Sequence, residues 1–268
     1  MPEADNHTDD LDLLREAAVE AGTIALRWFR QDPQVWMKQG DSPVSEADFT
    51  VDRFLRETLR AARPDYGWLS EESEDDLERL QTRRTFVVDP IDGTRGFIAG
   101  QKQWCVSIAI VEDGRPVAGV LECPALQQTF CASADGQTKL NGKAIVASLR
   151  AEGATTRVTG PRSFQAAIGK IGQVDMHRVP FVPSLAYRLA MIATGEVDIA
   201  LARGSAQDWD LAAADLIVER AGGRLSTLDG AELAYNRRDV RHGTLVASPK
   251  GRHDEMLDLA RLAMDKVA

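Results

Sequence analysis

The chain has 268 residues, of which 44% are hydrophobic, so it can bury a sizeable core in one large domain or two small ones. Its net charge of −9 argues against a broad electrostatic surface for a nucleic-acid polymer, and no apolar run approaches the roughly 20 residues of a membrane-spanning helix. The N-terminus, MPEADNHTDD, is acidic where a signal peptide would be basic and then apolar, so a cytoplasmic location is expected.

A frayed tail of about ten residues is expected before the first element, an amphipathic helix over residues 11–29. A second helix is predicted to begin after Ser45, a residue type that favours N-caps, and to end before Pro64. From about residue 86 to 130, short β-rich runs alternate with turn formers, which is typical of an antiparallel sheet.

The second half alternates between strands and helices. Strands are predicted in TRVTG, VDIALA and TLVAS, and helices over residues 184–194, over residues 209–221 and after Gly251. This order indicates an α/β layer beside the earlier α+β layer. Because no linker-like composition separates the halves, one domain with two subdomains sharing a core is predicted, with boundaries at about residues 10–145 and 146–268.

Cysteine and histidine usage favours no transition-metal site. The three cysteines, Cys105, Cys123 and Cys131, form no CxxC pair and are an odd number, so they are expected to be small core residues on strands. The four histidines share no metal-ligand spacing, and no role is predicted for them.

Carboxylates, in contrast, stand at the ends of short apolar elements. Glu71 and Glu72 follow WL in WLSEES, Asp89 and Asp92 follow FVV, and Asp210 stands near the start of a predicted helix. Clustered acids repel one another unless cations lie between them, and oxygen donors without nearby Cys or His favour Mg²⁺. The sequence therefore indicates a metal site.

The same stretch carries an anion site. The turn at Pro90 would free the Ile91 carbonyl as a further oxygen ligand, and Gly93 with Thr94 would open a helix whose free N–H groups suit a phosphate. Metals beside an anion site imply phosphoryl chemistry.

Each fragment also has an ordinary structural interpretation. Asp-Pro and Asp-Gly pairs are turn formers, and a Glu-Glu pair near a loop is usually a solvated face. Asp48 and Asp210 would stabilise helix dipoles from the first turn. Only the co-occurrence of these fragments favours a functional site.

Taken in order, SPVSEAD, SEES, VVDPIDGTRGF and WDLAAADLIVERAGG resemble the signatures of the inositol monophosphatase superfamily, from about residue 10 to the C-terminus. The resemblance implies a five-layered αβαβα sandwich, typically a homodimer. It also implies a phosphomonoesterase, often sensitive to lithium, that uses two or three Mg²⁺ ions on a small phosphorylated substrate.

The resemblance assigns metal ligands by position. The first ion would be bound by Glu71, Asp89 and the Ile91 carbonyl, and the second by Asp89, Asp92 and Asp210.

It also assigns catalytic roles. Asp48 and Thr94 match the pair that orients and activates the water attacking the phosphate monoester, and Glu71 joins them as a catalytic acid. The backbone amides of Gly93 and Thr94 would hold phosphate. Glu72 matches a second acid whose role is less direct.

The substrate is less constrained. Arg188 stands where inositol phosphatases often have an acid or amide and bisphosphate nucleotidases a lysine, and both the length of segment 198–210 and the basic turn TRGFIAG resemble the nucleotidases. A second phosphate needs a second cation, which arginine supplies bidentately. The predicted substrate contacts are Arg188, Ser184 and Arg203, and the predicted substrate is 3'-phosphoadenosine 5'-phosphate.

Other features oppose this choice. TGPRSF departs from the Ser-Arg-Ser-His pattern of a nucleotidase, and Ala202 stands where that group has arginine, for which Arg162 or Arg203 would have to compensate. Solvated surface arginines are an equally good interpretation of Arg188 and Arg203. Inositol 1-phosphate and histidinol phosphate stay open as substrates.

Other classes of function fare worse. The chain has no GxSxG motif and no Gly-x4-Gly-Lys-Ser/Thr loop, which argues against serine hydrolases and P-loop enzymes. A protein that binds metal and phosphate without turnover stays open, although the complete set of acids argues against it.

Overall fold

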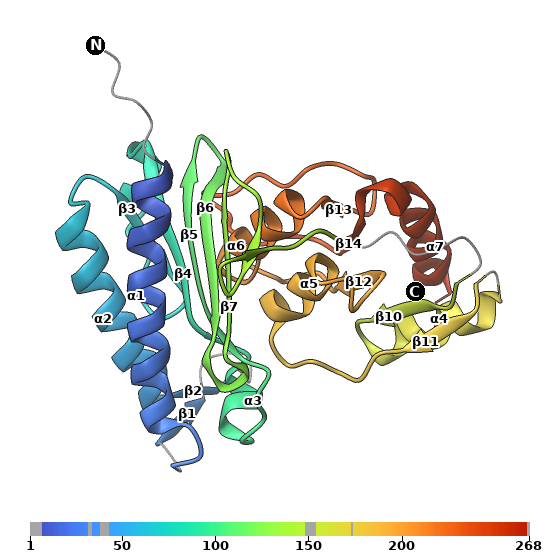
Figure 1. The fold of residues 1–268 in the computed structure, drawn as a ribbon, viewed down its shortest axis with the longest axis horizontal. Helices are drawn as coiled ribbons and strands as arrows, with labels where there is room; N and C mark the ends of the chain where they lie inside the picture. The colour runs from blue at the N-terminus through green and yellow to red at the C-terminus, as the bar shows by residue number, and fades with distance from the viewer. Residues whose placement is uncertain (1–6, 32–33, 38–42, 148–153, 173, 267–268) are drawn as a thin grey trace.

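Five layers, in the order helices, sheet, helices, sheet, helices, follow one another across the computed structural model (Figure 1). The structure describes residues 7–31, 34–37, 43–147, 154–172 and 174–266. The layered αβαβα sandwich expected from the sequence is thereby confirmed.

The first helical layer consists of α1 (His7–Trp28) and α2 (Glu46–Ala62), which cover one face of the larger sheet. Between them lies a small hairpin of β1 (Val35–Met37) and β2 (Pro43–Ser45). Ser45 is the N-cap of α2, as predicted.

The larger sheet has seven strands whose spatial order follows the chain. They are β3 (Gly67–Ser70), β4 (Arg84–Asp92), β5 (Cys105–Glu112), β6 (Arg115–Cys123), β7 (Gln128–Ser133), β8 (Lys139–Leu140) and β9 (Lys143–Ala144). Only β3 pairs in parallel with its neighbour; the other pairs are antiparallel, which confirms the predicted antiparallel sheet. The short helix α3 (Thr94–Ile98) directly follows β4, and 3-10 turns occupy Glu78–Gln81 and Pro124–Leu126.

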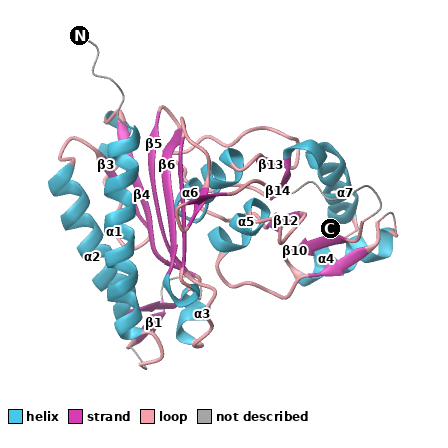
Figure 2. Ribbon diagram, in the orientation of Figure 1, coloured by secondary structure: helices cyan, strands magenta, loops and turns pink. Residues whose placement is uncertain are grey.

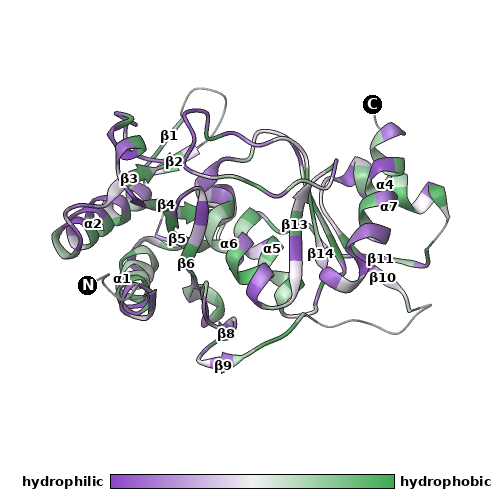
Figure 3. Ribbon diagram, turned by 90° about the horizontal axis from the view of Figure 1, so that it is seen from above, coloured by the Kyte–Doolittle hydropathy of each residue, from purple (hydrophilic) through white to green (hydrophobic). Residues whose placement is uncertain are grey.

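The middle layer consists of α5 (Leu185–Ala193) and α6 (Asp208–Arg220), which lie between the two sheets when the molecule is seen from above (Figure 3). Small residues bring α6 close to the larger sheet. A Cβ added to Gly119 of β6 would lie 3.1 Å from Ala213 Cα, so a larger residue there would push α6 away from the sheet.

The second sheet lies beyond the middle helices, on the side away from α1 and α2 (Figure 2). Its strand order is β11-β10-β12-β14-β13, with both parallel and antiparallel pairs. Its strands are β10 (Thr156–Thr159), β11 (Met176–Arg178), β12 (Ile199–Ala202), β13 (Gly223–Thr227) and β14 (Leu245–Pro249). The outer helices α4 (Arg162–Ile171) and α7 (His253–Asp265), with a 3-10 turn at Lys250–Arg252, cover its far face. The predicted strands and helices are present, whereas α4, β11 and β13 were missed.

Buried apolar side chains join these layers. One cluster includes Leu121 of β6, Ala190 of α5 and Leu225 of β13, so the first sheet, the middle helices and the second sheet pack against one another. The three cysteines are buried and free, as expected, on β5, β6 and β7. Within the described part of the chain, no helix combines the length and apolar character needed to span a membrane.

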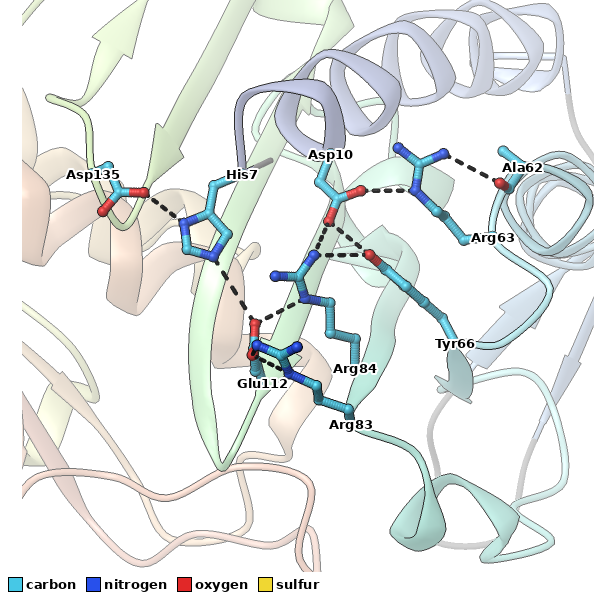
Figure 4. A network of polar contacts seen from close by, with 9 residues as sticks. All are labelled: His7, Asp10, Ala62, Arg63, Tyr66, Arg83, Arg84, Glu112 and Asp135. Atoms are coloured by element: carbon cyan, nitrogen blue, oxygen red, sulfur yellow. Dashed lines mark hydrogen bonds and ion pairs between the residues drawn. The ribbon is translucent and has the colours of Figure 1, made fainter. Parts of the chain in front are cut away.

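The N-terminal helix is anchored from its first turn (Figure 4). Asp10 is 2% exposed; it accepts hydrogen bonds from Arg63 Nε at 2.9 Å, Arg84 Nη1 at 3.0 Å and the Tyr66 hydroxyl at 2.9 Å. Because the helix begins at His7, the expected frayed tail is wrong for residues 7–10.

Stability is expected to fall in acid because of a buried histidine at the start of α7. His253 is 1% exposed between the hydroxyls of Ser226 and Ser248, each 2.8 Å away, and burial lowers its pKa to about 4. In the unfolded chain, His253 would be protonated below about pH 6.5. The stability that buried, neutral His253 contributes is therefore present above pH 6.5 and is lost as pH falls towards 4. Urea unfolding of the wild type and of His253→Gln should therefore diverge across this window, by up to about 3 kcal/mol. Parallel pH profiles would contradict this assignment.

Candidate active site

The two aspartates of VVDPIDGT face the same side of the larger sheet because β4 is irregular at its end. Residues three apart on a regular strand point to opposite faces. Here Asp89 pairs with Ser107 and Asp92 with Cys105, so β4 contains one residue more than β5 between the pairs. This bulge turns both carboxylates towards the middle helices.

Asp92 is fixed by the N-terminus of α5. Its Oδ2 accepts hydrogen bonds from the Ser184 hydroxyl at 2.5 Å and the Ala186 N–H at 2.6 Å, and Oδ1 accepts one from the Leu185 N–H at 3.1 Å. The helix end therefore holds this carboxylate in one orientation and attracts its negative charge.

Two further acids belong to capping boxes at the starts of helices. Asp48 Oδ2 accepts hydrogen bonds from the Ser45 N–H at 2.8 Å and the Ser45 hydroxyl at 2.6 Å, and Asp210 Oδ2 accepts one from the Gln207 N–H at 2.7 Å. The structural interpretation of these acids is therefore correct, and it does not exclude a second role for them.

Three of the acids meet. Asp89, Asp92 and Asp210 each offer a carboxylate oxygen, and the three oxygens lie within 4.8 Å of one another. Burial, followed by the charges of Glu71, Asp92 and Asp210, raises the pKa of Asp89 well above its ordinary value. Burial and the charge of Asp92 raise the pKa of Asp210 in the same direction.

This arrangement fits a divalent cation. Ionised carboxylates at such distances in a buried site repel one another, and a cation between them would remove that cost. The donors are all oxygen atoms, which Mg²⁺ prefers.

The acids open into a pocket of about 180 Å³. Its walls are formed by Pro43, Glu71, Asp89, Ile91, Asp92, Gly93, Thr94, Arg95, Pro183 and Asp210. The structure thus brings together every residue predicted to bind metal or phosphate. Sequence reasoning named no role for Pro43 or Pro183, which carry no chemical signal of their own.

Asp48 and Thr94 also lie side by side. The Thr94 hydroxyl is 3.3 Å from Asp48 Oδ1 and 3.0 Å from the Ile91 carbonyl, so its single proton is shared between two acceptors. Gly93, which precedes α3, has φ +94°, and a Cβ there would lie 3.0 Å from the Ser184 nitrogen. Only glycine suits this turn, which presses α3 against the start of α5.

Two of the three predicted substrate contacts, Arg188 and Ser184, lie near the acid cluster, and Arg203 does not. Arg188 of α5 is 8% exposed; burial lowers its pKa, and the charges of Asp92 and Asp210 oppose this shift. It is therefore not a solvated surface arginine. Arg203 is exposed and donates to the Ser163 hydroxyl at 2.8 Å, so the structure does not bring it to the pocket. Ser184 uses its hydroxyl to hold Asp92.

Arg95 was noted in the sequence only as part of a basic turn, yet it lines the pocket beside Thr94. Its position directly after the Asp-Gly-Thr motif was the signal that could have identified it.

Known proteins are similar to this chain over most of its length. A histidinol-phosphatase of Mycobacterium tuberculosis is 32% identical over 93% of this chain and 96% of its own length. A 3'(2'),5'-bisphosphate nucleotidase CysQ of Aggregatibacter actinomycetemcomitans is 30% identical over 84% and 86%, and an inositol-1-monophosphatase of Mesorhizobium japonicum is 31% identical over 88% and 92%.

Solved structures agree. The IMPase of Thermotoga maritima superposes with a TM-score of 0.84 at 25% identity, covering 97% of this chain and all of that one. The family model described as the inositol monophosphatase family matches residues 7–264. Since both the matched length and the acid cluster agree, this chain belongs to the inositol monophosphatase family of phosphoric monoester hydrolases.

Proposed function

We propose that this protein is a Mg²⁺-dependent phosphomonoesterase in which water attacks a small organic phosphate. The observation that carries the proposal is that the carboxylates of Asp89 and Asp92, which are buried, and of Asp210, which is partly buried, converge in one pocket with Thr94. A structural ion-pair network would surround each acid with side-chain cations, whereas the charges that act most on Asp89 are those of the acids Glu71, Asp92 and Asp210.

Metal binding is assigned to the residues lining the pocket. The proposed ligands of two or three Mg²⁺ ions are Glu71, Asp89, Asp92, Asp210 and the Ile91 carbonyl. Bound Mg²⁺ would supply positive charge against the phosphate and lower the pKa of water.

The other proposed functions, orienting the water, accepting its proton and binding the phosphate, belong to residues of this chain. Asp48 Oδ1 is placed to accept a proton through the Thr94 hydroxyl, which would orient the attacking water. Backbone N–H groups at the start of α3 have no acceptors within the helix, so those of Gly93 and Thr94 are proposed to hold the phosphate oxygens. Glu71 lies at the mouth of the same pocket as a further acid.

For the substrate, we propose 3'-phosphoadenosine 5'-phosphate. The CysQ relatives support it by name. Arg95, which lines the pocket, and Arg188, whose charge acts on Asp92 and Asp210, would supply two cations for a second phosphate. Histidinol phosphate is the second candidate, because two histidinol-phosphatases are each 32% identical over more than nine-tenths of this chain.

A substrate panel tests both levels of the proposal. With Mg²⁺ present, kcat/KM is measured for 3'-phosphoadenosine 5'-phosphate, histidinol phosphate and inositol 1-phosphate. The highest value for the adenosine bisphosphate supports the proposed substrate, and the highest value for another ester replaces it. Tight binding of Mg²⁺ and phosphate without turnover of any ester would instead identify a binding protein.

The role of Arg188 is tested by Arg188→Met, which keeps the length of the buried stem and removes the charge. If Arg188 binds the phosphate that is not cleaved, KM for the adenosine bisphosphate should rise about 10- to 150-fold, the equivalent of roughly 1.5–3 kcal/mol for one hydrogen bond to a charged group. KM for inositol 1-phosphate should change at least tenfold less. Equal changes for both esters would show that Arg188 serves only the acids Asp92 and Asp210.

The quaternary and cellular context is proposed from the family alone. We propose a cytoplasmic homodimer that is inhibited by lithium. Sedimentation and a lithium titration of the hydrolysis rate would test the state and the inhibition.

A further inference from the structure

The segment between β11 and α5 forms one rim of the active-site pocket. It ends in Pro183, which lines the pocket, and in Ser184, which holds Asp92. Two residues before Pro183 stands Phe181, and two extended residues span at most about 7 Å. The Phe181 backbone therefore lies within about 7 Å of a residue that lines the pocket.

Phe181 is exposed to a degree that folding does not explain. Its relative exposure is 64%, against 46% for Phe49 and 45% for Trp36, the other exposed aromatic side chains among the described residues. A ring left in water contributes little to the core, since the hydrophobic contribution follows the apolar area removed from water.

One side of this ring is nevertheless held in place. The guanidinium carbon of Arg188 lies 5.8 Å from the ring centroid, and Arg188 Nη1 is 3.4 Å from the Val182 carbonyl. Arg188 Nε is buried without a hydrogen-bond partner. A buried donor without an acceptor is costly, which indicates that a further group completes this corner when the site is filled.

We propose that Phe181 is a stacking platform for a planar aromatic ring in the alcohol part of the substrate. This inference rests on the proposed function, because it concerns the leaving group of the same phosphate ester. A ring lying on Phe181 would extend from the acids along the wall formed by Pro183 and would cover Arg188. The preferred esters are accordingly those that carry a heteroaromatic ring, and a cyclitol or sugar gains less from this contact.

Four phosphate esters distinguish the effect of an aromatic ring from the effect of a second phosphate. Adenosine 2'-monophosphate has a ring and one phosphate, and 3'-phosphoadenosine 5'-phosphate has a ring and two. Fructose 1,6-bisphosphate has two phosphates and no aromatic ring, and inositol 1-phosphate has one phosphate and no aromatic ring. Each is assayed with Mg²⁺ for kcat and KM.

Phe181→Leu keeps an apolar side chain and removes the ring. Base stacking on an aromatic side chain is worth enough to predict a rise of about tenfold in KM for both adenosine esters, with little change in kcat. KM for the two esters without an aromatic ring should change less than twofold. Phe181→Trp should restore the wild-type KM for the adenosine esters, and Leu262→Ala, which alters an exposed apolar residue of α7, should change none of the four.

Equal changes of KM for all four esters in Phe181→Leu, or no change for any, would refute the proposal that Phe181 stacks on the substrate's aromatic ring. If the wild type hydrolyses none of them, the proposed function fails, and the platform is then judged by equilibrium binding of adenosine 2'-monophosphate. Weaker binding to Phe181→Leu than to the wild type would support it, and equal binding would refute it.

Discussion

Replacing Asp89 by asparagine is expected to lower phosphatase activity by well over 100-fold. Losing an outer partner of a metal ligand typically costs roughly 10- to 100-fold, and Asp89 is proposed to touch the ions directly. The amide keeps the shape of the carboxylate, and its single oxygen can still accept the Ile91 N–H, which is 3.0 Å from Asp89 Oδ1. The measurement is kcat/KM across a Mg²⁺ titration.

Thermal unfolding distinguishes this loss from misfolding. Without metal, Asp89→Asn should be at least as stable as the wild type, because a buried charge repelled by Glu71, Asp92 and Asp210 has been removed. Saturating Mg²⁺ should stabilise the wild type, by about 2.7 kcal/mol at 100 times Kd, but hardly stabilise the variant.

A matched control is Asp215→Asn, which makes the same change at a buried carboxyl of a different element, α6. Asp215 accepts a hydrogen bond from the Tyr235 hydroxyl, and burial raises its pKa to about 6. It lies outside the acid cluster, so its variant should keep Mg²⁺-dependent activity. If Asp89→Asn remained active, or if both variants lost Mg²⁺ stabilisation alike, the metal assignment would be wrong.

Thr94→Ala is expected to lower kcat by about 10²-fold or more, the effect of losing a positioned proton-transfer group, while the Mg²⁺ concentration for half-maximal activity stays almost unchanged. The reason is that the Thr94 hydroxyl bridges Asp48 and the Ile91 carbonyl without being a proposed metal ligand. Thr94→Ser keeps the hydroxyl and should recover most of kcat.

Asp48→Asn completes a double-mutant cycle. Two residues that act as one unit give a double variant hardly slower than either single variant. If Thr94→Ala instead left kcat unchanged, the hydroxyl would have only a structural role at the start of α3.

The sequence predicted the chemistry of the site better than its geometry. Carboxylates beside a Gly-Thr turn indicate metal and phosphate by residue type alone, so Asp89, Asp92 and Thr94 could be identified. The bulge that turns Asp89 and Asp92 to one face depends on pairing with β5, and no local pattern reveals such a pairing. Register is a property of two strands.

The errors have similar causes. Burial of Arg188 and exposure of Arg203 depend on how the middle helices pack, which residue identity does not show. Helix α4 was missed because TGPRSF was considered as a substrate motif, although Phe164, Ala167 and Ile168 have helical spacing and are buried.

The hydrogen bonds from the start of α5 to Asp92 have a consequence for the order of folding. Asp89 and Asp92 precede Asp210 by more than a hundred residues, and the donors to Asp92 come from Ser184 and its neighbours. Closing such a span costs entropy before any of these contacts repays it. The carboxylates therefore meet only at a late stage of folding, once the chain beyond residue 180 has returned to the first sheet. A nascent chain that ends before Asp210 cannot gather them, so the proposed metal site can form only after the middle helices have been synthesised.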